Sequence, residues 1–199
     1  MPHPDPIKIY PYSPAWPEWF AAEREVLEVV FSSANVQIEH IGSTAVPGLG
    51  AKPIVDILLG APSLPVIEAK IPVLLTLDYQ YMPEHEAVFP NRRFLAKPKT
   101  RPRRYHLHAV ELHSDFWYEH IAFRDALRSD PELAHDYEKL KRQLAMRFGY
   151  DGRPTPMARI RLCILFWNAF VGRGKVCAVR ASPSLEPTGI FLVNETSPL

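Results

Sequence analysis

The sequence is poor in cysteine and has almost no excess of charge. Only two of its 199 residues are cysteines, Cys163 and Cys177, and 23 Lys and Arg face 22 Asp and Glu, a formal net charge of +1. No CxxC pattern is present, and the first ten residues lack the basic and apolar regions of a signal peptide. We therefore predict a cytoplasmic protein whose core needs no disulfide or metal, and the balance of charge argues against non-specific nucleic-acid binding.

Long apolar runs are also missing. The densest apolar segment, residues 163–171, contains Asn168 and is far shorter than the roughly 20 residues that cross a bilayer, so we predict no membrane partner. Glycine is scarce at 9 residues, whereas proline is abundant at 21, which favours rigid turns and helix starts over flexible linkers. With 47% hydrophobic residues, the composition suits one globular domain.

Hydrophobic periodicity predicts both helices and strands. Ser13-Pro14 and Asp130-Pro131 are typical helix starts, and residues 36–41 and 105–110 alternate as strands do. The predicted helices cover residues 14–32, 63–77 (interrupted by proline), 114–128 and 130–148. The predicted strands cover residues 36–41, 53–59, 92–96 and 105–110, and a short strand or turn begins at residues 79–81. These elements indicate an α+β fold, with helices packed on a sheet.

Charge is distributed unevenly along the chain. Residues 87–110 contain no acid, and the predicted helical region that follows, residues 115–138, is rich in acids. Two interpretations stay open: a local anion-binding site, or a solvated run of charge that is neutralised elsewhere in the fold. RNA binding is the weaker hypothesis because no aromatic stacking residues are interleaved with the cations. The basic segment contains Arg92, Arg93, Lys97, Lys99, Arg101, Arg103, Arg104, His106 and His108.

The most informative segment is HIGSTAVPGLGAKPIVDI, residues 40–57. A strand that ends in Gly42-Ser43 leads through a tight loop to a second strand, which carries Asp56. Gly42 would let the backbone approach a phosphate closely, and the Ser43 hydroxyl would donate a hydrogen bond to its oxygens. Asp56 would hold Mg²⁺ across the loop. A Gly-Ser pair alone is more often an ordinary turn, and a buried acid on the next strand strengthens the functional interpretation.

The chain resembles the GrpB family, which is an uncharacterised branch of the nucleotidyltransferase superfamily. The resemblance is carried by HIGSTAVPGLGAKPIVDIL, by RRF at residues 92–94, by RRYHLHAVE at residues 103–111 and by AFRDALR at residues 122–128, and it extends from about Ile7 to Phe148. It implies a nucleotidyltransferase-like domain over residues 1–149, built as a small mixed sheet flanked by helices. It also implies transfer of a nucleotidyl group by two divalent metals that acidic residues hold.

The family pattern can be carried over residue by residue. Gly42 and Ser43 match the phosphate-binding pair and Asp56 matches the first metal acid, but Leu58 stands where the superfamily places a second carboxylate, and an aliphatic side chain cannot bind Mg²⁺. The further phosphate-binding or nucleotide-binding candidates are Lys52, Arg92, Arg93 and Arg104.

His106 and His108 are candidate substitutes for the missing acid. Both lie on one face of their predicted strand, and with Asp56 they form the expected catalytic and metal-binding set. The expected cofactor is Mg²⁺ or Mn²⁺, with Zn²⁺ as a further candidate because imidazole favours it over Mg²⁺. A His pair on a strand more often binds carbonyls or phosphates than a metal, and His40 could be an ordinary core histidine. Glu111 is a further candidate acid, at an odd offset that places it on the opposite face.

Two functions from different classes follow. The first is a metal-dependent enzyme that binds a nucleoside triphosphate or another phosphorylated small molecule. The second is a non-catalytic nucleotide or coenzyme binding module, or a partner of another enzyme, which the leucine at position 58 favours. Residues 150–199 depart from the family and are predicted to form a divergent helix and tail. This segment would pack on the domain, form a homodimer interface or have no role, and all three alternatives stay open.

Overall fold

The computed structural model describes residues 8–148, and the predicted divergent segment of residues 150–199 lies outside the described residues. The predicted strands are all present, within about two residues of the expected bounds. The helices are α1 Ala15–Val30, α2 Leu64–Glu68, α3 Ile71–Thr76, α4 Asp115–Ser129 and α5 Pro131–Phe148, with short 3₁₀ helices η1 Ser43–Ala45 and η2 Pro83–Ala87. The strands are β1 Gln37–Ile41, β2 Val55–Ala61, β3 Gln80–Tyr81, β4 Arg92–Lys97 and β5 Tyr105–Glu111.

The helix ends follow from local sequence. The Ser114 hydroxyl accepts a hydrogen bond from the backbone N–H of Trp117 and caps α4, and Pro131 begins α5, where a missing N–H is tolerated. The proline-interrupted helix expected at residues 63–77 is two short helices, because Pro72 lies in the first turn of α3. Within the described residues, no helix is long and apolar enough to cross a membrane.

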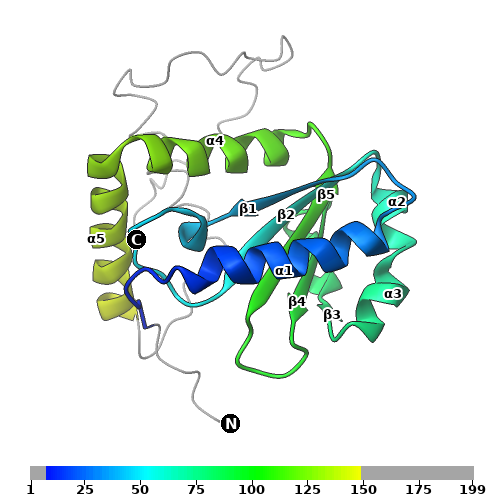
Figure 1. Cartoon of the computed structure of the whole chain (residues 1–199), viewed down its shortest axis with the longest axis horizontal. Helices are drawn as coiled ribbons and strands as arrows, with labels where there is room; N and C mark the ends of the chain where they lie inside the picture. Colours follow the sequence, from blue (N-terminus) through cyan, green and yellow to red (C-terminus); the bar gives the residue numbers. More distant parts are fainter. Residues whose placement is uncertain (1–7, 149–199) are drawn as a thin grey trace, which may run out of the picture. The chain divides into compact units, whose positions relative to one another are not determined.

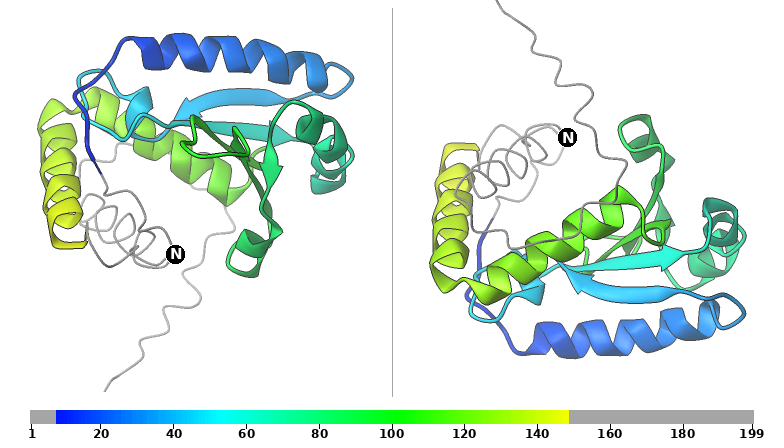
Figure 2. Two further views of the ribbon diagram at one scale, coloured as in Figure 1. Left: turned by 90° about the horizontal axis from the view of Figure 1, so that it is seen from below. Right: turned by 90° about the horizontal axis from the view of Figure 1, so that it is seen from above.

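The strands form one mixed sheet in the order β1-β2-β5-β4-β3. β2 and β5 run parallel, and the other neighbouring pairs are antiparallel. Figure 2 shows α1 and α4 on opposite sides of this sheet. The predicted α+β fold, a small mixed sheet flanked by helices, is therefore confirmed.

The two faces of the sheet are covered unequally (Figure 1). On the face toward α1, α2 and α3, alternate strand residues such as Ile57, Leu59 and Leu107 are fully buried in the main core. On the opposite face, α4 places Trp117 over Leu58 and forms a smaller cluster. The other strand residues on this second face lie outside the smaller cluster and are largely polar. They supply the candidate site.

A buried ion pair ties α1 to β4 within the main core. The Glu23 side chain accepts hydrogen bonds from Lys97 Nζ at 2.9 Å on each carboxylate oxygen, and from the Tyr79 hydroxyl at 2.9 Å. Glu23 is only 4% exposed. Burial and the neighbouring Glu23 carboxylate raise the pKa of Tyr79, so its hydroxyl stays protonated and keeps donating.

Truncation of this carboxylate leaves a mostly buried ammonium group without its partner. We expect Glu23→Ala to lower the free energy of unfolding by about 3 kcal/mol, as measured by urea denaturation. Glu28→Ala is the matched control, since the Arg24–Glu28 pair is about half exposed on the same helix, and its loss should be below about 0.5 kcal/mol. Equal losses in the two variants would contradict the structural role of the buried pair.

Candidate functional site

The Gly42-Ser43 loop lies against Asp56 where β1 ends and β2 begins. Ile41 pairs with Asp56 in the sheet, and Gly42 follows with a φ of 71°, a left-handed conformation that glycine adopts readily. A Cβ atom on Gly42 would lie 2.5 Å from Oδ2 of Asp56. Glycine is therefore required here twice, for its backbone conformation and for the space that the carboxylate fills.

Asp56 lies beside the two histidines of β5. The parallel register pairs Asp56 with His106, so the side chains of Asp56, His106 and His108 project from one face of the sheet. The Nδ1 atom of His106 lies 3.2 Å from Oδ1 of Asp56, and Nε2 of His108 lies 3.6 Å from the same oxygen. The structure therefore brings together the three residues that the sequence predicts to be catalytic.

Arg92 of β4 determines where the proton of His108 lies. Its NH1 atom is 3.3 Å from Nδ1 of His108, and a guanidinium group can only donate. Nδ1 of His108 therefore accepts, and in the neutral ring Nε2 carries the proton and points it toward Asp56. An ionised Asp56 only accepts, so Nδ1 of His106 donates to it, and in the neutral form of this ring Nε2 keeps its lone pair.

The charge states of these groups follow from burial and contacts. Burial alone would raise the pKa of Asp56, but the contacts with His106 and His108 outweigh it and hold that pKa well below its usual value. Burial lowers the pKa of His108, although Asp56 opposes the shift. At neutral pH the site therefore contains a carboxylate beside a neutral His108.

Arg92 is a buried cation without an acidic partner among residues 8–148. It is 7% exposed, its Nε atom has no hydrogen-bond partner, and no carboxylate of the described residues forms an ion pair with it. Its guanidinium carbon lies 4.2 Å from the ring centre of Phe89, 5.3 Å from that of Phe94 and 5.5 Å from that of Phe116. Burial lowers its pKa to about 10, which leaves it charged at neutral pH. An anion beside Arg92 would relieve this unpaired charge.

The fit to metal ions is limited. Leu58 is fully buried with Ile41, Val110 and Trp117, so the place of a second carboxylate is part of the apolar core. Arg92 occupies Nδ1 of His108 and Nε2 of that ring carries the proton, so His108 has no free lone pair. Among the described residues, no group of three or more His, Cys, Asp or Glu side chains forms a metal-binding cluster. One cation could still be held by Asp56 together with phosphate oxygens of a ligand, as is common for Mg²⁺.

The basic segment does not converge on Asp56. Alternation along β4 places Arg93 on the other face, where it pairs with Glu68 and Glu86. Arg104 is exposed and its guanidinium lies over Trp19 of α1 at 4.7 Å. Lys52 is exposed in the loop before β2, and the side chain of Glu111 accepts from the backbone of Leu64. Of the arginines predicted to bind phosphate, Arg92 is the one that contacts the Asp56–His108 group.

The sequence reasoning missed a cation from α5. Lys141 Nζ donates to the Ser43 hydroxyl at 2.9 Å and to the Gly50 carbonyl at 2.7 Å. Ser43 and Lys141 are 98 residues apart, and no local pattern connects them. The only available signal was the predicted helix at residues 130–148, which carries cations whose partners the sequence does not indicate.

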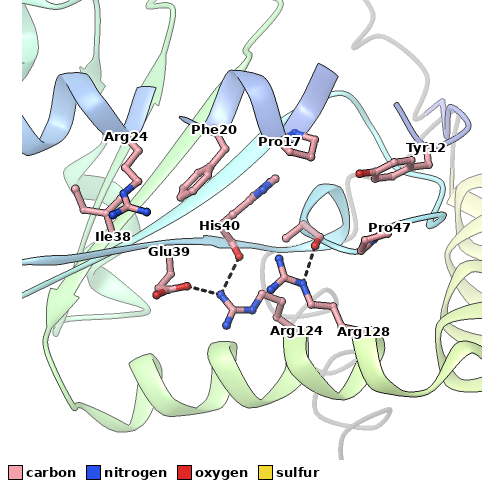
Figure 3. A pocket seen from close by; sticks show the side chains of 11 residues that line it. Tyr12, Pro17, Phe20, Arg24, Ile38, Glu39, His40, Pro47, Arg124 and Arg128 are labelled. Carbon is pink, nitrogen blue, oxygen red and sulfur yellow. Dashed lines mark hydrogen bonds and ion pairs between the residues drawn. The ribbon is translucent and has the colours of Figure 1, made fainter. Parts of the chain in front are cut away.

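A separate pocket of about 470 Å³ lies at the outer edge of β1, between α1 and α4 (Figure 3). His40 stacks on Phe20 in this pocket with ring centres 4.8 Å apart, and its Nε2 atom donates to the Thr44 hydroxyl at 3.0 Å, because that hydroxyl gives its own proton to the Ile54 carbonyl. Burial is the main reason that the pKa of His40 falls to about 4, with Arg128 and Arg124 contributing. His40 is thus a neutral core histidine.

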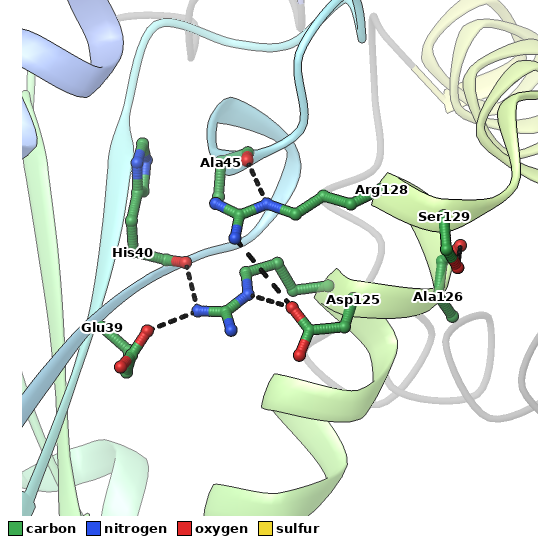
Figure 4. A network of polar contacts seen from close by, with 8 residues as sticks. Glu39, His40, Ala45, Asp125, Ala126, Arg128 and Ser129 are labelled. Atoms are coloured by element: carbon green, nitrogen blue, oxygen red, sulfur yellow. Dashed lines mark hydrogen bonds and ion pairs between the residues drawn. The ribbon is translucent and has the colours of Figure 1, made fainter.

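Two arginines of α4 bind the backbone of β1 and of the following loop (Figure 4). Arg124 donates to the Glu39 carboxylate at 2.6 Å and to the His40 carbonyl at 3.2 Å, and Arg128 donates to the Ala45 carbonyl at 2.9 Å. β1 is an edge strand whose outer carbonyl groups would otherwise lack partners. These contacts explain Glu39 and the two arginines of α4 in this pocket as structural groups.

Comparisons with known proteins agree on one family. A family model described as GrpB protein matches residues 6–156. The chain is 39% identical over 167 residues to a UPF0157 protein of Pseudomonas aeruginosa, covering 78% of this chain and 66% of that protein, just under two thirds of its length. It is 34% identical over 143 residues to the glutamate-rich protein GrpB of Alkalihalophilus pseudofirmus, covering 70% of this chain and 82% of that protein.

Two further comparisons extend this picture. The crystal structure of the conserved protein GrpB from Enterococcus faecalis has a TM-score of 0.69 and 29% sequence identity, and it covers 84% of this chain and 99% of that one. A dephospho-CoA kinase of Mycolicibacterium paratuberculosis is 28% identical over 171 residues, which are 73% of this chain and 41% of that protein.

Two glycines provide a test of why glycine is required at position 42. Gly42 and Gly48 both have positive φ, but a Cβ on Gly48 would meet nothing within 4 Å. Both alanine variants carry backbone strain, and Gly42→Ala carries more because the φ of 71° and ψ of −171° at Gly42 lie in a region that is almost restricted to glycine; it must also displace the Asp56 carboxylate. We expect Gly42→Ala to be less stable than Gly48→Ala by at least about 1 kcal/mol in urea unfolding. Similar losses would show that the close contact has no energetic consequence.

The buried neutral His40 predicts loss of stability in acid. In the unfolded chain a histidine takes up a proton near its ordinary pKa of 6.5, whereas folded His40 does so only near 4. Its contribution to stability is therefore complete above pH 6.5 and is lost as the pH falls toward 4. We expect wild type to lose about 2 kcal/mol more than His40→Gln between pH 7 and pH 4.5 in urea unfolding. Parallel pH profiles would be the opposite result.

Proposed function

The chain belongs to the GrpB family, and from the position of its Gly42-Ser43 loop against Asp56 we propose that it binds a nucleoside triphosphate or another phosphorylated small molecule. The observation that carries the proposal is the continuous polar line from this loop through Asp56 and His108 to Arg92. A glycine turn, a hydroxyl group and a buried unpaired guanidinium are the groups that a phosphate requires.

Each side chain has a distinct role in the proposed site. Ser43 donates its hydroxyl proton to a phosphate oxygen, and Arg92 neutralises charge that builds up during reaction. A divalent cation, Mg²⁺ or Mn²⁺, would bind Asp56 and the phosphate oxygens and would supply further neutralisation. A zinc site that uses both histidines is not part of the proposal, because His108 offers no lone pair.

The arrangement supports nucleotidyl transfer as the reaction to test. Nε2 of His106 would accept the proton of an acceptor hydroxyl group, with Asp56 stabilising the resulting imidazolium. The acceptor oxygen forms a bond to the α-phosphorus, the bond to the bridging oxygen breaks, and pyrophosphate leaves. The side chain of His106 is 25% exposed, so a substrate can reach part of the ring.

A second function is favoured by Leu58. Its complete burial excludes the second carboxylate of a two-metal site, so the fold would serve as a nucleotide or coenzyme binding module without catalysis. The relative named dephospho-CoA kinase supports including coenzyme A precursors among the ligands. A cytoplasmic location, the absence of a nucleic-acid partner and a homodimer remain predictions.

A thermal-shift screen separates the two functions. We expect ATP, or another triphosphate, with Mg²⁺ or Mn²⁺ to raise the Tm of wild type by about 5 °C at saturating ligand. Asp56→Asn should lose the metal-dependent part of this shift, and the control Asp136→Asn, at an exposed residue of α5, should keep it.

Any ligand that gives a metal-dependent increase in Tm, lost in Asp56→Asn, is then incubated with the protein and the reaction products are analysed. A ligand-induced increase in Tm that is the same with and without metal, and the same in wild type and Asp56→Asn, would favour the binding module over the enzyme. No shift with any nucleotide, coenzyme A precursor or inorganic polyphosphate, with or without Mg²⁺, Mn²⁺ or Zn²⁺, would overturn the proposed function.

A further inference from the structure

Helix α5 holds the loop that carries Ser43 through two charged side chains. Lys141 Nζ donates to the Gly50 carbonyl at 2.7 Å, and the Glu138 carboxylate accepts from the Gly50 backbone N–H at 2.8 Å. Arg142 holds Glu138 in place with two hydrogen bonds of 2.8 Å and 2.6 Å. The two polar groups of the Gly50 backbone are therefore both bound by α5, and the hydrogen bonds of Lys141 itself to Gly50 and Ser43 place its ammonium group on the loop.

The ammonium group of Lys141 contacts neutral oxygens. Its hydrogen-bond partners are the Ser43 hydroxyl and the Gly50 carbonyl, and its nitrogen lies 4.8 Å from the ring centre of Tyr137. Among residues 8–148, no carboxylate lies within ion-pair distance of Nζ, whereas Glu138 on the same helix is already paired with Arg142. A partly buried cation in such surroundings loses hydration without gaining a full counter-charge.

The direction of the hydrogen bonds prepares Ser43 for an anion. Because an ammonium group can only donate, the Ser43 oxygen accepts from Lys141 and its own proton remains available to another acceptor. A phosphate oxygen placed beside this hydroxyl would receive that proton, and its charge would lie close to Nζ. The same site would thus offer a hydroxyl donor and a cation from two distant parts of the chain.

We infer that Lys141 is an anion-binding residue of the candidate site, and that it binds the phosphate group of the ligand together with Ser43. The inference rests on the proposed function and names a residue that the sequence motif does not contain. Lys141 holds the phosphate at the loop end of the site, and Arg92 lies at the other end, beyond Asp56 and His108. The chemical class is a polyphosphate anion, for which inorganic tripolyphosphate is the simplest probe.

The protonation of Lys141 supports this role. Burial lowers its pKa to about 8, although Glu138 and Asp56 oppose the shift and Arg142 adds to it. These are the charged groups that face it from α5 and β2, and the carboxylates stay ionised above neutral pH because the pKa of each is lowered. A bound anion would raise the pKa of Lys141, so binding takes up a proton near pH 8 and above.

The test measures tripolyphosphate affinity by calorimetry at pH 7 with full-length variants. We expect Lys141→Met to weaken binding by about tenfold or more, since it removes a charge-assisted contact. Lys139→Met removes the same charge from an exposed position of α5 and should change affinity less than about twofold. Lys141→Arg keeps the charge and should stay within about threefold of wild type.

A second set of measurements distinguishes two roles of Lys141: binding the anion, or only holding the Gly50 loop in place, which we call a structural clamp. Glu138→Ala breaks the Gly50 contact and is compared with Lys141→Met at pH 6, where Lys141 stays protonated although loss of the Glu138 carboxylate lowers its pKa further; it should lower stability without weakening tripolyphosphate binding. Wild-type affinity relative to Lys141→Arg should fall about tenfold from pH 7 to pH 9, because the guanidinium does not titrate in this range. This comparison uses two charged proteins and does not depend on the folding of Lys141→Met.

The outcomes are distinguishable. If wild type binds tripolyphosphate and Lys141→Met and Lys139→Met bind equally well, the role of Lys141 is overturned and the proposed function stands. If Glu138→Ala weakens binding as much as Lys141→Met, or if the wild-type and Lys141→Arg pH profiles coincide, Lys141 acts only as a clamp. If wild type binds neither tripolyphosphate nor any nucleotide, with or without Mg²⁺, the proposed function itself falls.

Discussion

The candidate site depends on the contact between Gly42 and the Asp56 carboxylate. Because Gly42 has no Cβ, the loop can lie directly on Oδ2, and the other carboxylate oxygen remains free to accept from the β5 histidines. Asp56 orients His106, and Arg92 sets the tautomer of His108 from the other side. One close backbone approach therefore fixes a carboxylate, two imidazoles and a guanidinium across three strands. A side chain at position 42 would disturb all of these contacts together.

Much of this arrangement could be predicted from the sequence because it depends on strand periodicity. Alternation places His106 and His108 on one face, and the acid-bearing strand at residues 53–59 proved to be their parallel neighbour in the sheet. The turn and cap residues placed α4 and α5 within a residue or two of their bounds. The proximity of Asp56, His106 and His108 thus follows from strand alternation. The tautomer of His108 depends on its contact with Arg92, which only the three-dimensional structure shows.

The remainder could not be predicted, for reasons that are specific to each residue. Arg93 is adjacent to Arg92, but the alternation of β4 turns it to the face where Glu68 and Glu86 lie. The basic segment therefore divides between the two faces of the sheet. Lys141 reaches Ser43 only because α5 packs on the Gly50 loop, a tertiary contact across most of the domain. Sequence spacing carries no information about such a contact.

Leu58 limits the chemistry that the proposed site can perform. A carboxylate at that position would be buried with Ile41, Val110 and Trp117 and would be costly without a partner, so the apolar cluster under α4 and a second metal acid exclude each other. The proposed site compensates for this with fixed protein charges. Arg92 and Lys141 together carry the same positive charge as one divalent cation, and they lie at opposite ends of the line that runs from Ser43 to β4. A phosphorylated ligand bound along this line would be neutralised by one divalent metal ion and two side chains, which together carry the same positive charge as two divalent metal ions.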